Sequence, residues 1–141
     1  MANFADRVIQ FNKELEFSTP LYNGIQTMNP FKETVEIISI IESFYGKFYG
    51  DNKRRKMILG INPGRLGAGV TGIPFTDTKR LTENCGIEIE SVKSHEPSSV
   101  FIYELIGSYG GTTKFYQDFY INSVCPLGFI EKSKKGNWVN R

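Results

Sequence analysis

The apolar positions near the N-terminus recur at helical spacing. Phe4, Val8, Phe11 and Leu15 fall on one face of residues 4–17, with charged residues between them. This spacing predicts an amphipathic helix. The next segment, residues 18–31, is rich in proline and glycine and is predicted to be an irregular connection with a turn at residues 28–30.

Residues 32–49 are apolar over a wider face. The apolar positions on and beside this face are Val35, Ile37, Ile38, Ile40, Ile41, Phe44, Tyr45 and Phe48. A stripe of this width predicts the major core helix, and Gly50-Asp51-Asn52 is predicted to end it. The basic run at residues 53–56 then indicates a solvated entry into the next element.

Two short apolar runs, residues 57–61 and 119–124, predict buried strands. Between them, Asp77 is the predicted cap of a helix over residues 78–84 that ends at Gly86. Residues 86–97 are predicted to form either an edge strand or a surface loop.

The remaining elements are predicted from caps and breakers. Ser98 and Ser99 are the expected caps of a helix over residues 100–109, which Gly110-Gly111 closes. A helical turn is expected at residues 114–118. Residues 130–141 are polar and show no pattern.

Helices that alternate with strands predict one α/β layered domain over residues 1–141, with a parallel sheet. The loops after both strands are expected on one rim, where ligands of such sheets bind. Only two strands are predicted, whereas sheets of this kind normally have four or more. The chain therefore reads as half of such a fold, and its open sheet edge predicts a homo-oligomer.

The amino-acid composition excludes few classes of function. The 141 residues include 17 basic and 15 acidic ones, so bulk charge does not argue for nucleic acid, and clusters such as residues 53–56 and 132–135 have to carry that case. The aromatic fraction of 13% is expected in the core. No apolar stretch has the length of a signal peptide or membrane span, so we expect a cytoplasmic protein that binds no membrane.

The residues of usual metal or acid–base chemistry are sparse. Cys85 and Cys125 are far apart and lie in no CxxC pattern, so we expect reduced thiols and no metal or cofactor. His95, the one histidine, is expected to lie in a surface loop without a catalytic role.

The segment that stands out is residues 60–75, which contains Gly60, Gly64, Gly67, Gly69 and Gly72. Such a segment allows sharp turns and close approach of a ligand. The spacing of Gly67, Gly69 and Gly72 matches the dinucleotide fingerprint, but these glycines come late after the strand, and no helix is expected at residues 73–75. Neither a Walker A loop nor a GxSxG motif occurs.

Two motifs resemble a known family. Gly60-Ile61-Asn62-Pro63-Gly64, Gly67 and residues 71–75 (Thr-Gly-Ile-Pro-Phe) resemble the first active-site motif of the single-strand-selective monofunctional uracil-DNA glycosylases, in their bacterial subgroup. Residues 120–129 (Tyr-Ile-Asn-Ser-Val-Cys-Pro-Leu-Gly-Phe) resemble that family's second conserved strand and its Cys-Pro-Leu turn.

The resemblance implies a three-layer glycosylase fold and a DNA-repair hydrolase that cleaves the N-glycosidic bond of uracil or a damaged pyrimidine flipped out of DNA. In such an enzyme Asn62 would be catalytic and would hold the attacking water near C1′. The base would contact the following residues: Ile61, Pro63, Gly64, Ala68, Phe75 and Ser123. The candidate DNA contacts are Arg65, Lys132, Lys134 and Lys135.

The chain departs from the family pattern at two places. Ser123 stands where the family has a uracil-reading asparagine, and Asn122 is expected to face the other side of the strand. The family's later His-Pro motif is absent, and His95 does not match its context. The resemblance thus implies a fold incomplete at the C-terminus and lowered activity, and the alternative is a noncatalytic remnant that binds nucleic acid or a nucleobase.

Overall fold

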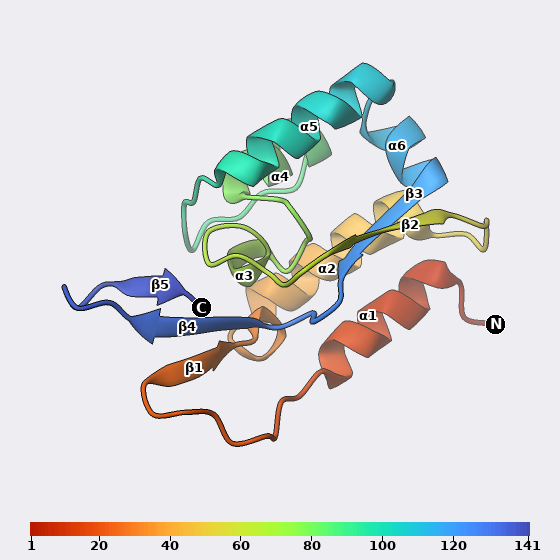
Figure 1. The fold of residues 1–141 in the computed structure, drawn as a ribbon. Coiled ribbons are helices and arrows are strands. Elements are labelled where there is room, and N and C mark those ends of the chain that lie inside the picture. Colours follow the sequence, from red (N-terminus) through yellow and green to blue (C-terminus); the bar gives the residue numbers. More distant parts are fainter.

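The computed structural model describes all residues, 1–141. In chain order (Figure 1), the elements are α1 (Phe4–Glu14), β1 (Ile25–Met28), the 3₁₀ helix η1 (Pro30–Lys32), α2 (Val35–Tyr49), β2 (Lys56–Gly60), α3 (Ala68–Thr71), α4 (Thr78–Cys85), α5 (Pro97–Tyr109), α6 (Thr112–Asp118), β3 (Phe119–Ser123), β4 (Gly128–Lys132) and β5 (Trp138–Asn140). No helix is both long enough and apolar enough to cross a membrane.

The first predicted helix forms, but it ends at Glu14. A capping box starts it, in which Asn3 Oδ1 accepts the Asp6 N–H and the Asp6 carboxylate accepts the Asn3 N–H, each at 2.9 Å. Leu15 leaves the helical conformation, and its carbonyl accepts a 2.9 Å hydrogen bond from the Asn29 side chain. This tertiary contact, which no local pattern signals, ends α1 early.

The predicted core helix is confirmed as α2, which begins at Val35 after the Thr34 cap, three residues later than predicted, and ends at Tyr49 before the Gly50 cap. Ile41, Phe44 and Tyr49 are each at most 2% exposed. Phe4, Phe48, Tyr116 and Tyr120 join them in edge-to-face and tilted ring pairs. The aromatic residues therefore supply the core, as composition predicted.

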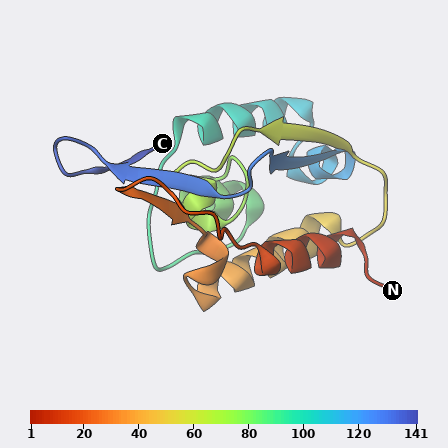
Figure 2. The same cartoon turned by 60° about the horizontal axis from the view of Figure 1, so that its bottom comes forward.

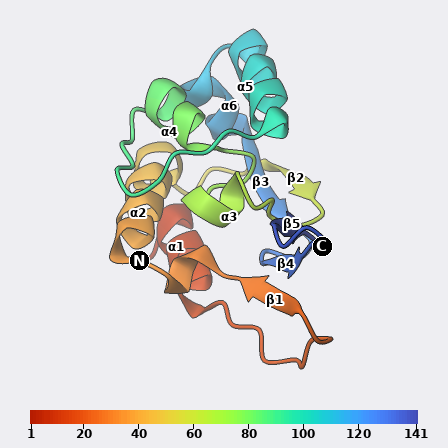
Figure 3. The same cartoon turned by 90° about the vertical axis from the view of Figure 1, so that its left-hand side faces the viewer.

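The two predicted strands pair in parallel, with Lys56 opposite Phe119 and Gly60 opposite Ser123. Figure 1 shows this pair running between α1 and α5. The outer edge of β2 pairs with no strand, and β2 lies at the margin of the molecule (Figure 3). The prediction of a buried strand was wrong for β2, because Met57 and Leu59, on one face of this strand, are 60% and 56% exposed.

A second sheet was not predicted from the sequence. Strands β1, β4 and β5 form an antiparallel sheet in the order β1-β4-β5, at the opposite end of the molecule from the N-terminus (Figure 2). The expectations of irregular structure at residues 18–31 and 130–141 were wrong at these strands. The strands are short. The ladder of β1 with β4 joins Ile25 to Glu131 and Met28 to Gly128, over a long sequence separation, whereas β4 and β5 form a local hairpin with Lys132 opposite Trp138.

Two further expectations need correction. Ser98 and Ser99 do not cap α5, which begins at Pro97. The basic run is not wholly solvated, because the Arg55 side chain is only 2% exposed and bonds to Asp51 and the Tyr116 carbonyl. Of the two alternatives for residues 86–97, the surface loop is the one observed, and it ends where α5 begins.

Candidate functional site

The loops after β2 and β3 leave the parallel pair at the same rim, as predicted. The ladder continues past both strands, with hydrogen bonds from the Val124 N–H to the Gly60 carbonyl at 2.9 Å and from the Cys125 N–H to the Ile61 carbonyl at 3.0 Å. The two motifs singled out in the sequence therefore lie side by side.

A cavity of about 40 Å³ opens between these loops. Its lining residues are Asn62, Pro63, Gly64, Ala68, Pro74, Phe75, Glu96 and Ser123. An adjoining cavity of about 20 Å³ shares Pro63, Ala68, Pro74 and Ser123 with it. The structure thus brings together every residue predicted to contact a base except Ile61, whose side chain is 84% exposed.

Asn62 and Ser123 carry the polar groups of the predicted site. Both side chains are partly buried at the cavity, and neither makes a hydrogen bond within the protein. Asn122 differs, because its amide donates to the Tyr120 hydroxyl at 2.9 Å and accepts the Ser123 N–H at 2.8 Å. Asn62 and Ser123 are therefore free to bind a ligand or water, whereas Asn122 is engaged in the fold.

Phe75 forms one wall of the cavity with a strained backbone. Its φ of 52° is the only positive value at a residue other than glycine, and such strain persists only where surrounding contacts hold it. The buried Thr71 hydroxyl donates to the Thr76 carbonyl at 2.7 Å and accepts the Ile73 N–H at 3.1 Å, which fixes the turn. A Cβ at Gly60 would lie 3.0 Å from the Phe75 ring, so Gly60 makes room for the ring.

Glu96 was not predicted from the sequence as a site residue. Its carboxyl group reaches the loop after β2, where a Cβ at Gly64 would lie 2.3 Å from Oε1 and a Cβ at Gly67 would overlap Oε2. Any side chain at either glycine would therefore displace the carboxyl group. The sequence predicted that a base approaches this loop at its glycines. In the structure, the Glu96 carboxyl group lies against these glycines.

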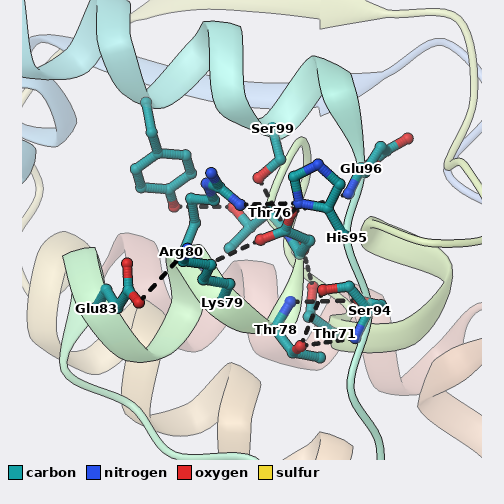
Figure 4. A network of polar contacts seen from close by, with 12 residues as sticks. Thr71, Thr76, Thr78, Lys79, Arg80, Glu83, Ser94, His95, Glu96 and Ser99 are labelled. Carbon is teal, nitrogen blue, oxygen red and sulfur yellow. Dashed lines mark hydrogen bonds and ion pairs between the residues drawn. The ribbon is translucent and has the colours of Figure 1, made fainter.

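The backbone of Glu96 is held by a polar network around Asp77 (Figure 4). Asp77 is fully buried and caps α4 as predicted, because Oδ1 accepts the Arg80 N–H at 2.9 Å. Oδ2 accepts the Glu96 N–H at 2.9 Å and the Arg80 guanidinium at 3.2 Å. The Asp77 N–H donates to the Ser99 hydroxyl at 3.1 Å, so the network fixes the start of α5.

Burial raises the pKa of the Glu96 carboxyl above its usual value, the Ser98 hydroxyl lowers it, and the negative charge of Asp77 raises it. The carboxyl group itself extends away from the network (Figure 4). The only local signal for Glu96 is its position before Pro97 at a helix start. Nothing in the sequence places that helix start opposite the glycine loop.

The other sequence-predicted residues lie around the site rather than in it. The Arg65 N–H donates to Asn140 Oδ1 at 2.9 Å, which ties the motif loop to β5. Lys132 lies 5.4 Å from the Trp138 ring centre, and Lys134 and Lys135 are exposed beyond it. The His95 side chain is 63% exposed and lies near Asp77, outside the cavity.

The glycines that match a dinucleotide fingerprint serve another purpose. Gly67 and Gly72 flank α3 and Gly69 lies within it; this single turn closes at Gly72 in the left-handed conformation, with φ 75°. A Cβ at Gly72 would lie 2.9 Å from Phe31. These glycines allow the segment around α3 to pack closely against side chains of the core, such as Phe31.

Comparisons with known proteins agree with this geometry. The family model described as the uracil DNA glycosylase superfamily matches residues 47–140. Among solved structures, the chain is similar to the crystal structure of wild-type Pedobacter heparinus SMUG2, with 55% sequence identity and a TM-score of 0.95. The match covers all of this chain and 61% of that chain. A search of curated proteins found no match.

Proposed function

The chain belongs to the uracil DNA glycosylase superfamily, and we propose that it binds uracil or a damaged pyrimidine flipped out of DNA and hydrolyses its N-glycosidic bond. The observation that carries this proposal is the pair of free polar groups, Asn62 and Ser123, beside the Phe75 ring in one cavity. The similarity to SMUG2 supports the proposal.

Each wall of the cavity suits part of a flipped nucleotide. The Phe75 ring offers a flat surface on which a base stacks. The Ser123 hydroxyl offers a hydrogen-bond donor and acceptor to the base edge. Asn62 lies two residues after the end of β2, and its amide is available to hold a water molecule against C1′.

In the reaction, the bond between C1′ and the base nitrogen breaks and its electron pair leaves with the base. The water oxygen forms a new bond to C1′, and its proton passes to solvent. An amide has no proton-accepting pKa near neutrality, so Asn62 positions the water and does not deprotonate it. The rate then depends on groups that stabilise the departing anion.

A second candidate function is base binding without efficient turnover. It is favoured by the cavity lining, which contains no histidine, lysine or arginine to stabilise the departing base. By analogy with oxyanion-hole donors, lack of such a donor costs about 10²- to 10³-fold in rate. The chain also spans only 61% of the SMUG2 chain.

The test is incubation with a single-stranded oligonucleotide that contains one uracil, followed by alkaline cleavage of abasic sites. We expect strand cleavage with the wild type and the exposed-site control Asn23→Ala, and its loss with Asn62→Ala. Binding to an abasic oligonucleotide without cleavage, unaffected by Asn62→Ala, would favour the second function. Neither binding nor cleavage would reject both.

A further inference from the structure

The Glu96 carboxyl group lines the cavity but has no role in the reaction described above. It shares the cavity with Asn62, Phe75 and Ser123, and it lies against the two glycines of the motif loop. A cavity of about 40 Å³ holds a few water molecules. The Glu96 carboxyl group is one of the polar groups that line this cavity, so a base that enters it lies within reach of the Glu96 side chain.

Within the protein, only the neighbouring Ser98 hydroxyl acts on the Glu96 carboxyl group as a hydrogen-bond donor. Glu96 is the N-cap residue of α5, but its side chain makes no capping hydrogen bond. The backbone N–H, not the carboxyl group, is what Asp77 holds. The carboxyl group is about half-buried against Gly64 and Gly67, and a smaller side chain would leave the helix start unchanged.

We propose that Glu96 determines which base the cavity accepts, because its carboxyl group accepts a hydrogen bond from an N–H or O–H group on the base edge that faces the glycine loop. This inference rests on the proposed function. It assigns Glu96 a polar role beside that of Ser123 in the same cavity.

The two side chains complement each other. The Ser123 hydroxyl has one O–H donor, whereas the asparagine amide of the family has N–H donors and a separate carbonyl acceptor. A carboxylate supplies acceptors only, so Ser123 as donor and Glu96 as acceptor together match a base that carries both a carbonyl and an N–H or O–H group. A base without the donor would leave a half-buried carboxylate unpaired, which is unfavourable.

The groups around Glu96 allow its carboxyl group to accept a hydrogen bond from the base after the base has displaced water from the cavity. Asp77 is the charged group that acts on it, and Arg80 at 3.2 Å and His95 at 3.7 Å both lie on Asp77 Oδ2. Burial and Asp77 raise the pKa of Glu96.

The experiment measures binding and does not require turnover. Single-stranded oligonucleotides carry one 2′-fluoro nucleotide, which resists glycosidic cleavage, in two matched pairs. Uracil against 3-methyluracil tests a donor at N3, and 5-hydroxymethyluracil against thymine tests a donor on the 5-substituent. A tetrahydrofuran abasic oligonucleotide measures binding that does not depend on the base.

In the wild type we expect a preference of about tenfold or more for the donor-bearing base in at least one pair. Glu96→Leu should abolish that preference and leave tetrahydrofuran binding unchanged. Glu96→Gln, whose amide oxygen still accepts, should retain part of it. Glu104→Gln, an exposed change on the same helix, should match the wild type.

Two results overturn the inference alone: no preference in either pair, or a preference that Glu96→Leu leaves intact, each with normal tetrahydrofuran binding. A wild type that does not bind the tetrahydrofuran oligonucleotide overturns the proposed function, and this inference falls with it. The pair that shows the preference identifies which edge of the base faces Glu96.

Discussion

The Glu96 backbone N–H donates a 2.9 Å hydrogen bond to Oδ2 of Asp77, so the cap of α4 also positions the residue that enters the cavity. Asp77 was predicted from the sequence only as a helix cap. Its second oxygen links the starts of α4 and α5, and the link makes Glu96 sensitive to a change at Asp77.

Asp77→Asn should therefore destabilise the protein by about 2 kcal/mol, because the amide keeps the cap but cannot also accept the Glu96 N–H and the Arg80 guanidinium. Urea denaturation measures the change. Asp6→Asn, at the exposed capping box of α1, serves as the control and should cost about 1 kcal/mol or less. Equal losses in the two variants would contradict the linking role of Asp77.

Phe75→Leu should weaken binding of a uracil oligonucleotide by about tenfold or more, because a leucine offers no flat surface for stacking. Binding of a tetrahydrofuran oligonucleotide should change little. Phe101→Leu, at a ring that is 64% exposed on α5, is the matched control. An equal loss for both oligonucleotides would show that Phe75 shapes the loop and does not stack on the base.

Arg55→Met should destabilise the protein by about 1.5–3 kcal/mol, the range for hydrogen bonds to charged groups, because Arg55 is buried whereas its partner Asp51 is 34% exposed. Arg55 bonds to both Asp51 oxygens, at 2.9 and 3.1 Å, and to the Tyr116 carbonyl at 2.8 Å. Thermal or urea unfolding measures the loss. Arg54→Met, at an exposed neighbour in the same basic run, should be nearly neutral, and similar losses would contradict the buried role of Arg55.

The same pair predicts a dependence of stability on pH. Hydrogen bonds from Arg55 are the largest cause that lowers the pKa of Asp51 below its usual value. The stabilisation is therefore present above the Asp pKa of the unfolded chain and is lost as pH falls through the lower folded value. Between about pH 5 and pH 2 the wild type should lose more stability than Arg55→Met. Parallel unfolding curves across this range would contradict the assignment.

The unpaired edge of β2 keeps the prediction of a homo-oligomer open to test. Met57, Leu59 and Ile61 are 60%, 56% and 84% exposed beside that edge, and an open apolar edge invites pairing. We expect sedimentation velocity to show concentration-dependent association that Leu59→Lys abolishes. Val35→Lys, at an exposed apolar residue on α2, is the control. A wild type that is monomeric at all concentrations would reject the prediction.

The elements that were predicted correctly are those whose signal is local. The amphipathic spacing of α2, the Asp77 cap and the two runs that form β2 and β3 each lie within one segment. The pairing of β1 with β4 carries no such signal, because Ile25 finds its partner only at Glu131. Strands β4 and β5 form a local hairpin, with Lys132 opposite Trp138, which the polar composition of these residues did not reveal. Arg55 also looked like a solvated residue of a basic run, and only packing against Tyr49 and Tyr116 shows that it is buried.

The candidate site also combines features that the sequence predicted with features that only the tertiary structure shows. The two motifs name Asn62, Phe75 and Ser123, because the residue types and their order along the chain were sufficient for that resemblance. Only the tertiary structure decided that the Asn62 and Ser123 side chains are free, that Asn122 is engaged by Tyr120, and that Glu96 closes the cavity. Hydrogen-bond partners and the approach of a side chain to a distant glycine depend on how separate segments pack, and that packing leaves no trace in the local pattern of residues.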